Sequence, residues 1–264
     1  MVEDHDYFIK FPNKYIHENI SEQYGLNKKF YIVYILISKN RACNNYSWIS
    51  VQNVLCAMGY NTERKNTKIF REVIYVIKYL IAMRMIKLLR NINIDSVRYD
   101  TAIEVEIITE NFDPQNNFCK LSFSQIDFIT NNQTSIRTEN ILMVFLYVNS
   151  YIILRPKNEG EEIMSATDQA NNPEVFWRST TQMARVLGLS KNTIRQCLNY
   201  LTTSQPSPKT GETLPPLLLE VKTNSISYTS EHTTYVPNAY ALNQAGSSRE
   251  IQWAINKMLG ISVE

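Results

Sequence analysis

The sequence predicts an α+β protein that is mainly α-helical. Helical apolar runs dominate the chain, and short strand-like runs follow them in pairs. The composition, 44% hydrophobic and 20% charged over 264 residues, supplies enough apolar material for real cores and does not resemble that of a disordered protein. This length allows one large domain or two of ordinary size, and we expect two.

The first half reads as a strand, three helices and a hairpin. The expected elements are a strand over residues 7–11, a buried helix over 28–39, a helix over about 50–58 and an amphipathic helix over 67–82. Gly59 suits the left-handed end of the second helix. The runs "MIKLLR" and "TAIEVEIIT" then predict two strands joined by the polar tip "NINIDSVRYD". This order describes a winged helix, in which the third helix enters a DNA groove and the hairpin tip touches the backbone beside it.

The second half repeats this order without evident sequence identity. The turn formers of "NFDPQNN" mark a boundary at residues 111–117. The elements expected after it are a helix over about 139–154, a polar loop to residue 173, a strand over 175–178, a helix pair over 179–201, a Pro-rich connection over 202–216, and strands over 217–222 and 233–238. We therefore expect two tandem winged helix-turn-helix domains, 1–112 and 118–245, followed by a C-terminal helix in 246–264 whose apolar stripe docks against the rest.

The helix pair "STTQMARVLGLSKNTIRQCLNYL" fits the helix-turn-helix template closely. Ser179 and Gln182 have the spacing of a capping box, and Ser190 can cap the second helix. Gly188 supplies the positive φ that closes the turn, and Leu189 plugs it.

The outward face of the second helix carries side chains suited to base edges. Arginine suits guanine, asparagine or glutamine suits adenine, and threonine can meet the thymine methyl group. The candidate DNA-binding residues here are Ser190, Lys191, Asn192, Thr193, Arg195, Gln196 and Asn199. No acid occurs between Ser179 and Leu201, although acids are common on ordinary solvated helices. The alternatives are a dimerisation module or a plain surface helix, and the template fit favours DNA.

The charge of the chain is unevenly distributed. The net charge is only +2, yet residues 61–90 hold eight Lys or Arg against two Glu, and residues 178–222 hold six against two. The first island predicts a second DNA-reading helix, although its turn, from Gly59 to Asn66, is longer than the template. Its candidate residues are Lys65, Asn66, Thr67, Lys68, Arg71 and Tyr75, with Arg90 and Arg98 as backbone contacts on the hairpin.

The sequence contains few groups of residues that could catalyse a reaction. There is no nucleotide-binding P-loop and no HExxH, and the three histidines are far apart in sequence. Glu104 and Glu106 form the tightest carboxylate pair on a strand, where their alternation with apolar residues indicates the wet face of a sheet. We expect Cys56 and Cys197 to be buried and the three tryptophans to act as packing anchors. The sequence predicts neither an enzyme nor a cofactor or metal.

The pattern as a whole resembles the winged-helix replication initiators of plasmids and phages in Gram-positive bacteria and the related DnaD-like proteins. The resemblance rests on "YFIKFPNKYI", on "SWISVQNVLCAMGY" with the following "IFREVIYVIKYLIAMRMIKL", and on the second unit with its closing "TTYVPNAYAL". It implies binding to repeated origin sites, self-association as a homodimer, and delivery of a helicase or its loader.

We therefore expect a cytoplasmic protein without a membrane partner that binds specific double-stranded DNA, as the replication initiator of a plasmid, phage or other mobile element. The alternatives are a winged-helix transcriptional regulator and a non-enzymatic adaptor of the replication machinery. Neither an initiator nor a regulator needs catalytic residues that the sequence would show. The two roles must therefore be distinguished by where the bound DNA sites lie.

Overall fold

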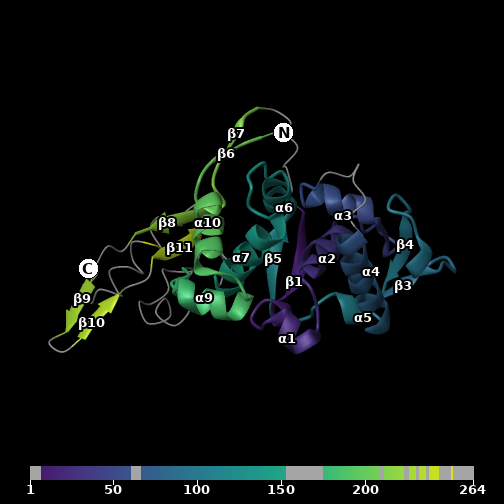
Figure 1. Ribbon diagram of the computed structural model, residues 1–264, viewed down its shortest axis with the longest axis horizontal. Coiled ribbons are helices and arrows are strands. Elements are labelled where there is room, and N and C mark those ends of the chain that lie inside the picture. Colours follow the sequence, from purple (N-terminus) through teal and green to yellow (C-terminus); the bar gives the residue numbers. More distant parts are fainter. Residues whose placement is uncertain are drawn as a thin grey trace, which may run out of the picture.

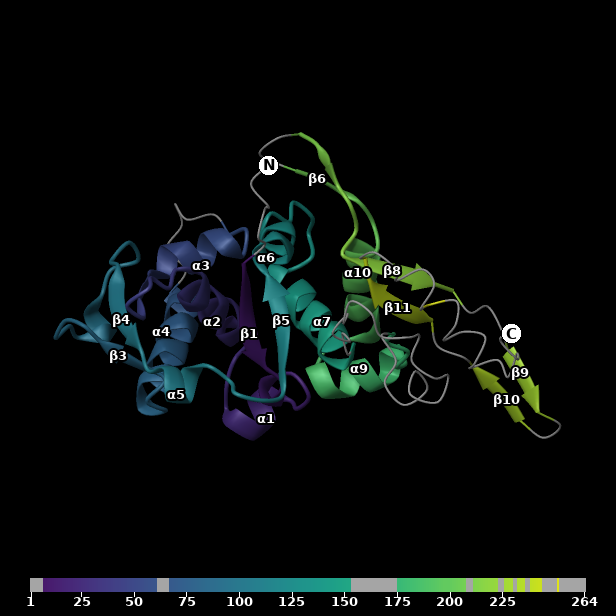
Figure 2. The ribbon, with the colours of Figure 1, turned by 180° about the vertical axis from the view of Figure 1, so that it is seen from behind.

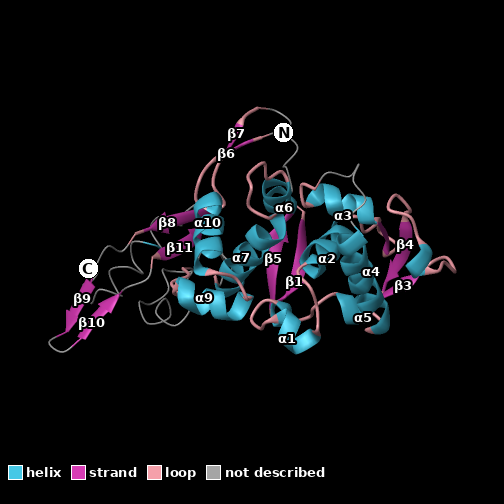
Figure 3. Ribbon diagram, in the orientation of Figure 1, coloured by secondary structure: helices cyan, strands magenta, loops and turns pink. Residues whose placement is uncertain are grey.

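The computed structural model describes residues 7–60, 67–152, 175–207, 211–222, 226–229, 232–235, 238–243 and 251. The protein is α+β, with helices packed around small antiparallel sheets (Figure 3). Two groups of helices flank a central pair of strands, as both views of the ribbon show (Figures 1 and 2). No helix within the described ranges is long and apolar enough to cross a membrane.

The first group, here called the first unit, runs from α2 to β4. Its elements are α2 (Lys29–Lys39), β2 (Tyr46–Ile49), α3 (Val51–Ala57), α4 (Thr67–Ala82), β3 (Ile86–Leu88), a 3-10 turn η2 (Ile94–Ser96) and β4 (Ile103–Ile107). The three strands form an antiparallel sheet in the order β2-β4-β3. The helices and hairpin expected from the sequence are confirmed, and Gly59 has the left-handed φ of 72° expected after α3.

The second group, here called the second unit, repeats this topology. Its elements are α7 (Thr138–Tyr151), α9 (Thr180–Leu187), α10 (Lys191–Leu201), β8 (Leu218–Val221) and β11 (Ala239–Leu242). β11 pairs with β8 on one side, and on the other Tyr240 exchanges two backbone hydrogen bonds of 2.7 and 2.8 Å with Phe176. In both units, therefore, the extended segment between the first and second helices lies beside the last strand.

Several elements of the second unit differ from the expectation. The strand expected over 175–178 is a single bridge at Phe176. The partner of β8 is β11, whereas His232–Tyr235, which forms β10, pairs with β9 (Ile226–Thr229). The Pro-rich connection contains a short pair, β6 (Gln205–Pro206) and β7 (Thr213–Leu214). Hydrophobic alternation indicates strands but not their partners, so these pairings could not be predicted from the sequence.

The central pair of strands is β1 (Phe8–Pro12) with β5 (Phe118–Ser122). The remaining elements are a 3-10 turn η1 (Asn13–Tyr15), α1 (Ile20–Tyr24), α5 (Thr109–Phe112) and α6 (Phe123–Thr130). The strand over residues 7–11 was expected to belong to the first domain, yet its partner lies 110 residues further along the chain. Because both strands lie between the two units, this ribbon connects them (Figure 1).

One buried core extends through both units. Every residue of α7 from Thr138 to Asn149 except Asn140 is buried, as expected of a helix enclosed by its neighbours. α7 packs against α2 of the first unit and against α9 and α10 of the second. The core is thus continuous across residues 112–118, and the division into separate domains there stays a prediction.

The predicted C-terminal helix lies outside the described residues except for Ile251. That residue is buried in a small cluster with Val175, Ala239 and Ala241. The expected docking of the apolar stripe is therefore seen at this one position. The polar loop expected up to residue 173 also lies outside the described residues.

Candidate nucleic-acid interface

The α9–α10 pair has the local geometry of the predicted helix-turn-helix. The Ser179 side chain accepts a hydrogen bond from the Gln182 backbone N–H at 3.2 Å, and the Gln182 side chain accepts one from the Ser179 N–H at 3.0 Å, which completes the capping box. Gly188 has φ 60° and ends α9. Ser190 accepts from the Thr193 N–H at 3.0 Å and begins α10. These local predictions are confirmed.

α10 buries one side and leaves the other open. The buried residues are Ile194, Cys197, Leu198, Tyr200 and Leu201, and the exposed ones are Lys191, Asn192, Arg195, Gln196 and Asn199. At 100° per residue the exposed side chains span an arc of about 140°. Ser190 and Thr193 bond to each other through their hydroxyl groups at 2.8 Å, so their side chains serve the helix start.

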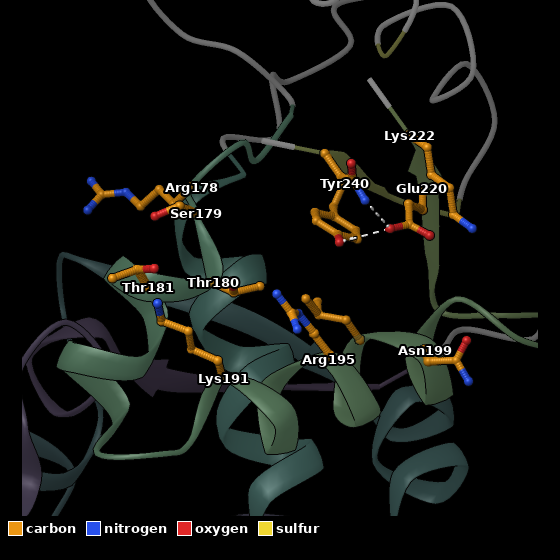
Figure 4. A pocket seen from close by; sticks show the side chains of 12 residues that line it. Arg178, Ser179, Thr180, Thr181, Lys191, Arg195, Asn199, Glu220, Lys222 and Tyr240 are labelled. Carbon is orange, nitrogen blue, oxygen red and sulfur yellow. Dashed lines mark hydrogen bonds between the residues drawn. The ribbon is translucent and has the colours of Figure 1, made fainter. Parts of the chain in front are cut away.

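A pocket of about 520 Å³ adjoins this exposed arc. Its lining comes from Arg178 and the start of α9, from one edge of the α10 arc, and from β8 and β11. Figure 4 shows Lys191 and Arg195 on successive turns of α10, both directed toward the beginning of α9 and the sheet, with Lys222 extending from β8. The pocket therefore has three walls, formed by the start of α9, by α10 and by the strands β8 and β11.

The pocket is electropositive. Arg178, Lys191, Arg195 and Lys222 line it, and none of them forms an ion pair with an acid in the described part of the chain. Its carboxylate, Glu220, accepts hydrogen bonds from the Tyr240 hydroxyl at 2.9 Å and from the Asn238 amide at 2.8 Å.

Two of the pocket's cations were not chosen as site residues from the sequence. Arg178 and Lys222 are the first and last residues of the second basic island, so the clustering of basic residues could have identified them. The approach of Arg178 depends on the bridge from Phe176 to Tyr240, and that of Lys222 depends on the pairing of β8 with β11. Neither pairing can be read from the residues themselves.

The first unit also exposes one face of its predicted reading helix. Thr67, Lys68, Arg71 and Tyr75 are exposed along α4. A groove of about 380 Å³ runs between this face and η2 at the hairpin tip, where Asp95 forms part of its lining. Lys65 and Asn66, also predicted to contact DNA, lie outside the described residues.

Acids pair with most cations on the first unit's hairpin. The predicted backbone contacts Arg90 and Arg98 form ion pairs of 2.9 Å with Glu104 and 3.1 Å with Asp100. The groove cation Lys78 lies 2.5 Å from Asp95 on η2. Pairs this exposed contribute about 0–1 kcal/mol and can exchange for other partners. Lys68 and Arg71 form no such pair with a described acid, so the free positive charge of this face lies on α4.

The carboxylates Glu104 and Glu106 lie on the partly exposed face of β4. No group of three His, Cys, Asp or Glu side chains within the described ranges could hold a metal ion. Glu104 pairs with Arg90, and Glu106 lies 3.9 Å from Lys87, as expected of a wet sheet face.

Two packing expectations were wrong. Cys56 is exposed, because it lies on the side of α3 opposite the buried residues Val51, Val54 and Leu55, whereas Cys197 is buried as expected. Trp48, expected to be a packing anchor, is 43% exposed on β2, where it alternates with the buried residues Ser47 and Ile49.

No protein-family model matches the chain, and no curated protein matches its sequence.

Proposed function

We propose that the chain is a sequence-specific double-stranded DNA-binding protein built from two winged-helix units. It acts without enzymatic activity, as the replication initiator of a plasmid, phage or other mobile element. The initiator role rests on the sequence resemblance and on the pairing of two such units in one chain. A homodimer and a helicase or helicase loader are the partners that this role implies.

The observation that carries DNA binding is the concave, acid-poor face of the second unit. The B-DNA major groove, about 12 Å wide, admits one α-helix. With α10 in the groove, Asn192, Arg195 and Gln196 reach base edges. The start of α9 and the sheet then flank the groove, so Lys191 and Lys222 meet the phosphates, while the Arg178 guanidinium stacks on Tyr151 with its central carbon 4.0 Å from the ring centre.

The first unit contributes a second, weaker contact. Its reading helix α4 presents Lys68 and Arg71, while the cations of its hairpin are engaged by acids. Binding DNA there requires those pairs to open. For six to eight phosphate contacts in all, the logarithm of affinity falls with the logarithm of salt at a slope of about −5 to −7.

Selection of bound fragments from the host element's own DNA tests this function. The proposal expects enrichment of a defined sequence, with half-sites about 10 base pairs apart or a multiple of that spacing, since both units belong to one body. Repeats beside an AT-rich region support initiation, whereas a single operator overlapping a promoter indicates a transcriptional regulator. Failure to retard any duplex at low salt, with retained partner binding, contradicts the proposal and indicates an adaptor.

A further inference from the structure

The outward face of the β1–β5 ribbon carries a repeated pattern that duplex binding does not use. Each strand contains the sequence Phe-x-Lys: Phe8 to Lys10 in β1, and Phe118 to Lys120 in β5. The alternate residues Ile9 and Cys119 are buried in the core, so both phenylalanines and both lysines lie on the opposite face.

The register brings the two lysines together. Lys10 is directly opposite Lys120 in the antiparallel ladder. Like charges at such a position destabilise a sheet. Both side chains are exposed, and neither forms an ion pair with a described acid. An anion bound between them would relieve this repulsion.

Aromatic rings flank the lysine pair on both sides. The Lys10 Nζ lies 4.8 Å from the centre of the Phe118 ring, and the Lys120 Nζ lies 4.8 Å from that of Phe8. Phe8 is 49% exposed, although rings of this size are usually buried.

We propose that this ribbon face binds single-stranded nucleic acid, specifically the separated DNA strand. Exposed rings offer stacking surfaces to unpaired bases, and interleaved lysines neutralise the phosphates between them, which is the combination that sequence-tolerant single-strand sites use. Duplex DNA keeps its bases stacked and inaccessible to these rings. An acidic peptide would satisfy the lysines but would leave the rings without a planar partner.

This face stands apart from the α10 pocket, so the inference does not depend on duplex recognition. It adds a second activity, and only the choice of DNA as the bound strand rests on the proposed replication role.

The test uses the full chain and two fluorescent probes, a 16-nucleotide oligothymidylate and an abasic oligomer of the same length, titrated by anisotropy at several salt concentrations. The charge variant is Lys10→Gln with Lys120→Gln, and the stacking variant is Phe8→Leu with Phe118→Leu. Lys14→Gln is the matched control, because Lys14 is also exposed and also lies 4.8 Å from a ring centre, that of Tyr15, but is outside the ribbon.

The charge variant is expected to bind oligothymidylate about tenfold more weakly or worse, with a salt slope shallower by about 1.4, the value for two phosphates on a single strand. Its melting temperature should stay close to that of the unmodified protein, because removal of the repulsive pair offsets the loss of the two lysine–ring contacts. Lost binding then cannot be attributed to unfolding. The stacking variant should lose the preference for oligothymidylate over the abasic oligomer.

Three outcomes would overturn the proposal: no binding of oligothymidylate at low salt, equal losses in the charge variant and Lys14→Gln, or equal affinity of the unmodified protein for the two probes. Competition by polyglutamate as effective as that by oligothymidylate would likewise reject it in favour of an acidic protein partner. Arg195→Ala, which targets duplex recognition, should leave single-strand affinity unchanged, so this proposal and the duplex proposal fail separately.

Discussion

Lys29 and Glu139 form an ion pair sealed from solvent between the two units. The Lys29 Nζ lies 2.6 Å from Glu139 Oε1, and the side chains are only 7% and 2% exposed. Lys29 begins α2 of the first unit, and Glu139 lies in the first turn of α7 of the second. The pair therefore joins the first unit to the second, and each unit carries one of the two proposed reading helices.

Removal of one partner of this pair should be costly. Glu139→Ala leaves the Lys29 ammonium buried without its carboxylate, and we expect a loss of about 3–5 kcal/mol in the free energy of unfolding. The double variant Lys29→Met with Glu139→Leu removes both charges and should recover most of that loss. Urea denaturation measures both. Asp95→Ala, which breaks the exposed pair with Lys78, is the control and should cost at most about 1 kcal/mol. A double variant as unstable as the single one would show that the charges themselves are not the cause.

The turn between α9 and α10 depends on Gly188. Its φ of 60° is unfavourable for any residue with a Cβ atom, and a Cβ there would lie 3.4 Å from the Asn19 side-chain nitrogen. Gly188→Ala should lower the free energy of unfolding by about 1–2 kcal/mol and weaken duplex binding, because α10 is displaced.

Gly211→Ala is the matched control for this substitution. Gly211 has φ 71° with nothing within 4 Å of an added Cβ, so its conformational cost is similar and its packing cost absent. A Gly211→Ala variant that loses duplex affinity as much as Gly188→Ala would contradict the assigned role of the turn.

The cysteines should fall into two reactivity classes. Cys43 and Cys56 are exposed, whereas Cys119 and Cys197 are buried, and burial raises the pKa of each buried thiol to about 12. A thiol reacts as its thiolate, so iodoacetamide at pH 8 should modify Cys43 and Cys56 and spare the other two until the protein unfolds. Peptide mass mapping of the treated protein identifies which cysteines are alkylated. Modification of Cys197 in the native state, at the rate seen for Cys43, would mean that α10 is not packed as described.

His17 should make the protein less stable in mild acid. Its pKa is lowered below 6.5, first by burial and then by the charge of Arg178, against a smaller opposing effect of Glu18. The ring bonds Ser150 at 2.9 Å and stacks on Tyr151. The unfolded chain therefore binds a proton at His17 more readily than the folded protein, so stability is complete above pH 6.5 and falls as the pH drops toward the folded pKa.

Melting temperatures at pH 7.5 and 5.5 check this effect. His17→Gln keeps a side-chain donor for Ser150 but cannot titrate, and its melting temperature should fall less between the two pH values than that of the unmodified protein. An equal fall in both proteins would assign the acid sensitivity to other groups.

Local signals in the sequence predicted local structure well. The bounds of α4, Thr67 and Ala82, agree with the prediction, because its apolar stripe is regular over four turns. The capping at Ser179 and Ser190 was also predicted correctly, because each capping hydrogen bond joins residues only three positions apart in the sequence.

Non-local pairing was not predictable in the same way. β2 (Tyr46–Ile49) is short and was missed, and β5 was also missed, because its partner β1 is distant in sequence. The consequence for function is direct. Phe-x-Lys in each strand could be read from the chain, but the opposition of Lys10 and Lys120 exists only through the register. Arg178 and Lys222 reach the α10 pocket through strand pairing for the same reason.

The most direct measurement compares Arg195→Ala with Arg185→Ala on a selected duplex and on random duplex of equal length. Arg195 lies on α10 and lines the pocket, whereas Arg185 is an exposed arginine on α9 that does not line the pocket. Arg195→Ala is expected to cost about 1–3 kcal/mol on the selected duplex and much less on random DNA, while Arg185→Ala changes both little. Lys68→Ala on α4 should weaken both duplexes alike. Equal losses for Arg195→Ala on the two duplexes, or no loss on either, would contradict the claim that α10 reads bases.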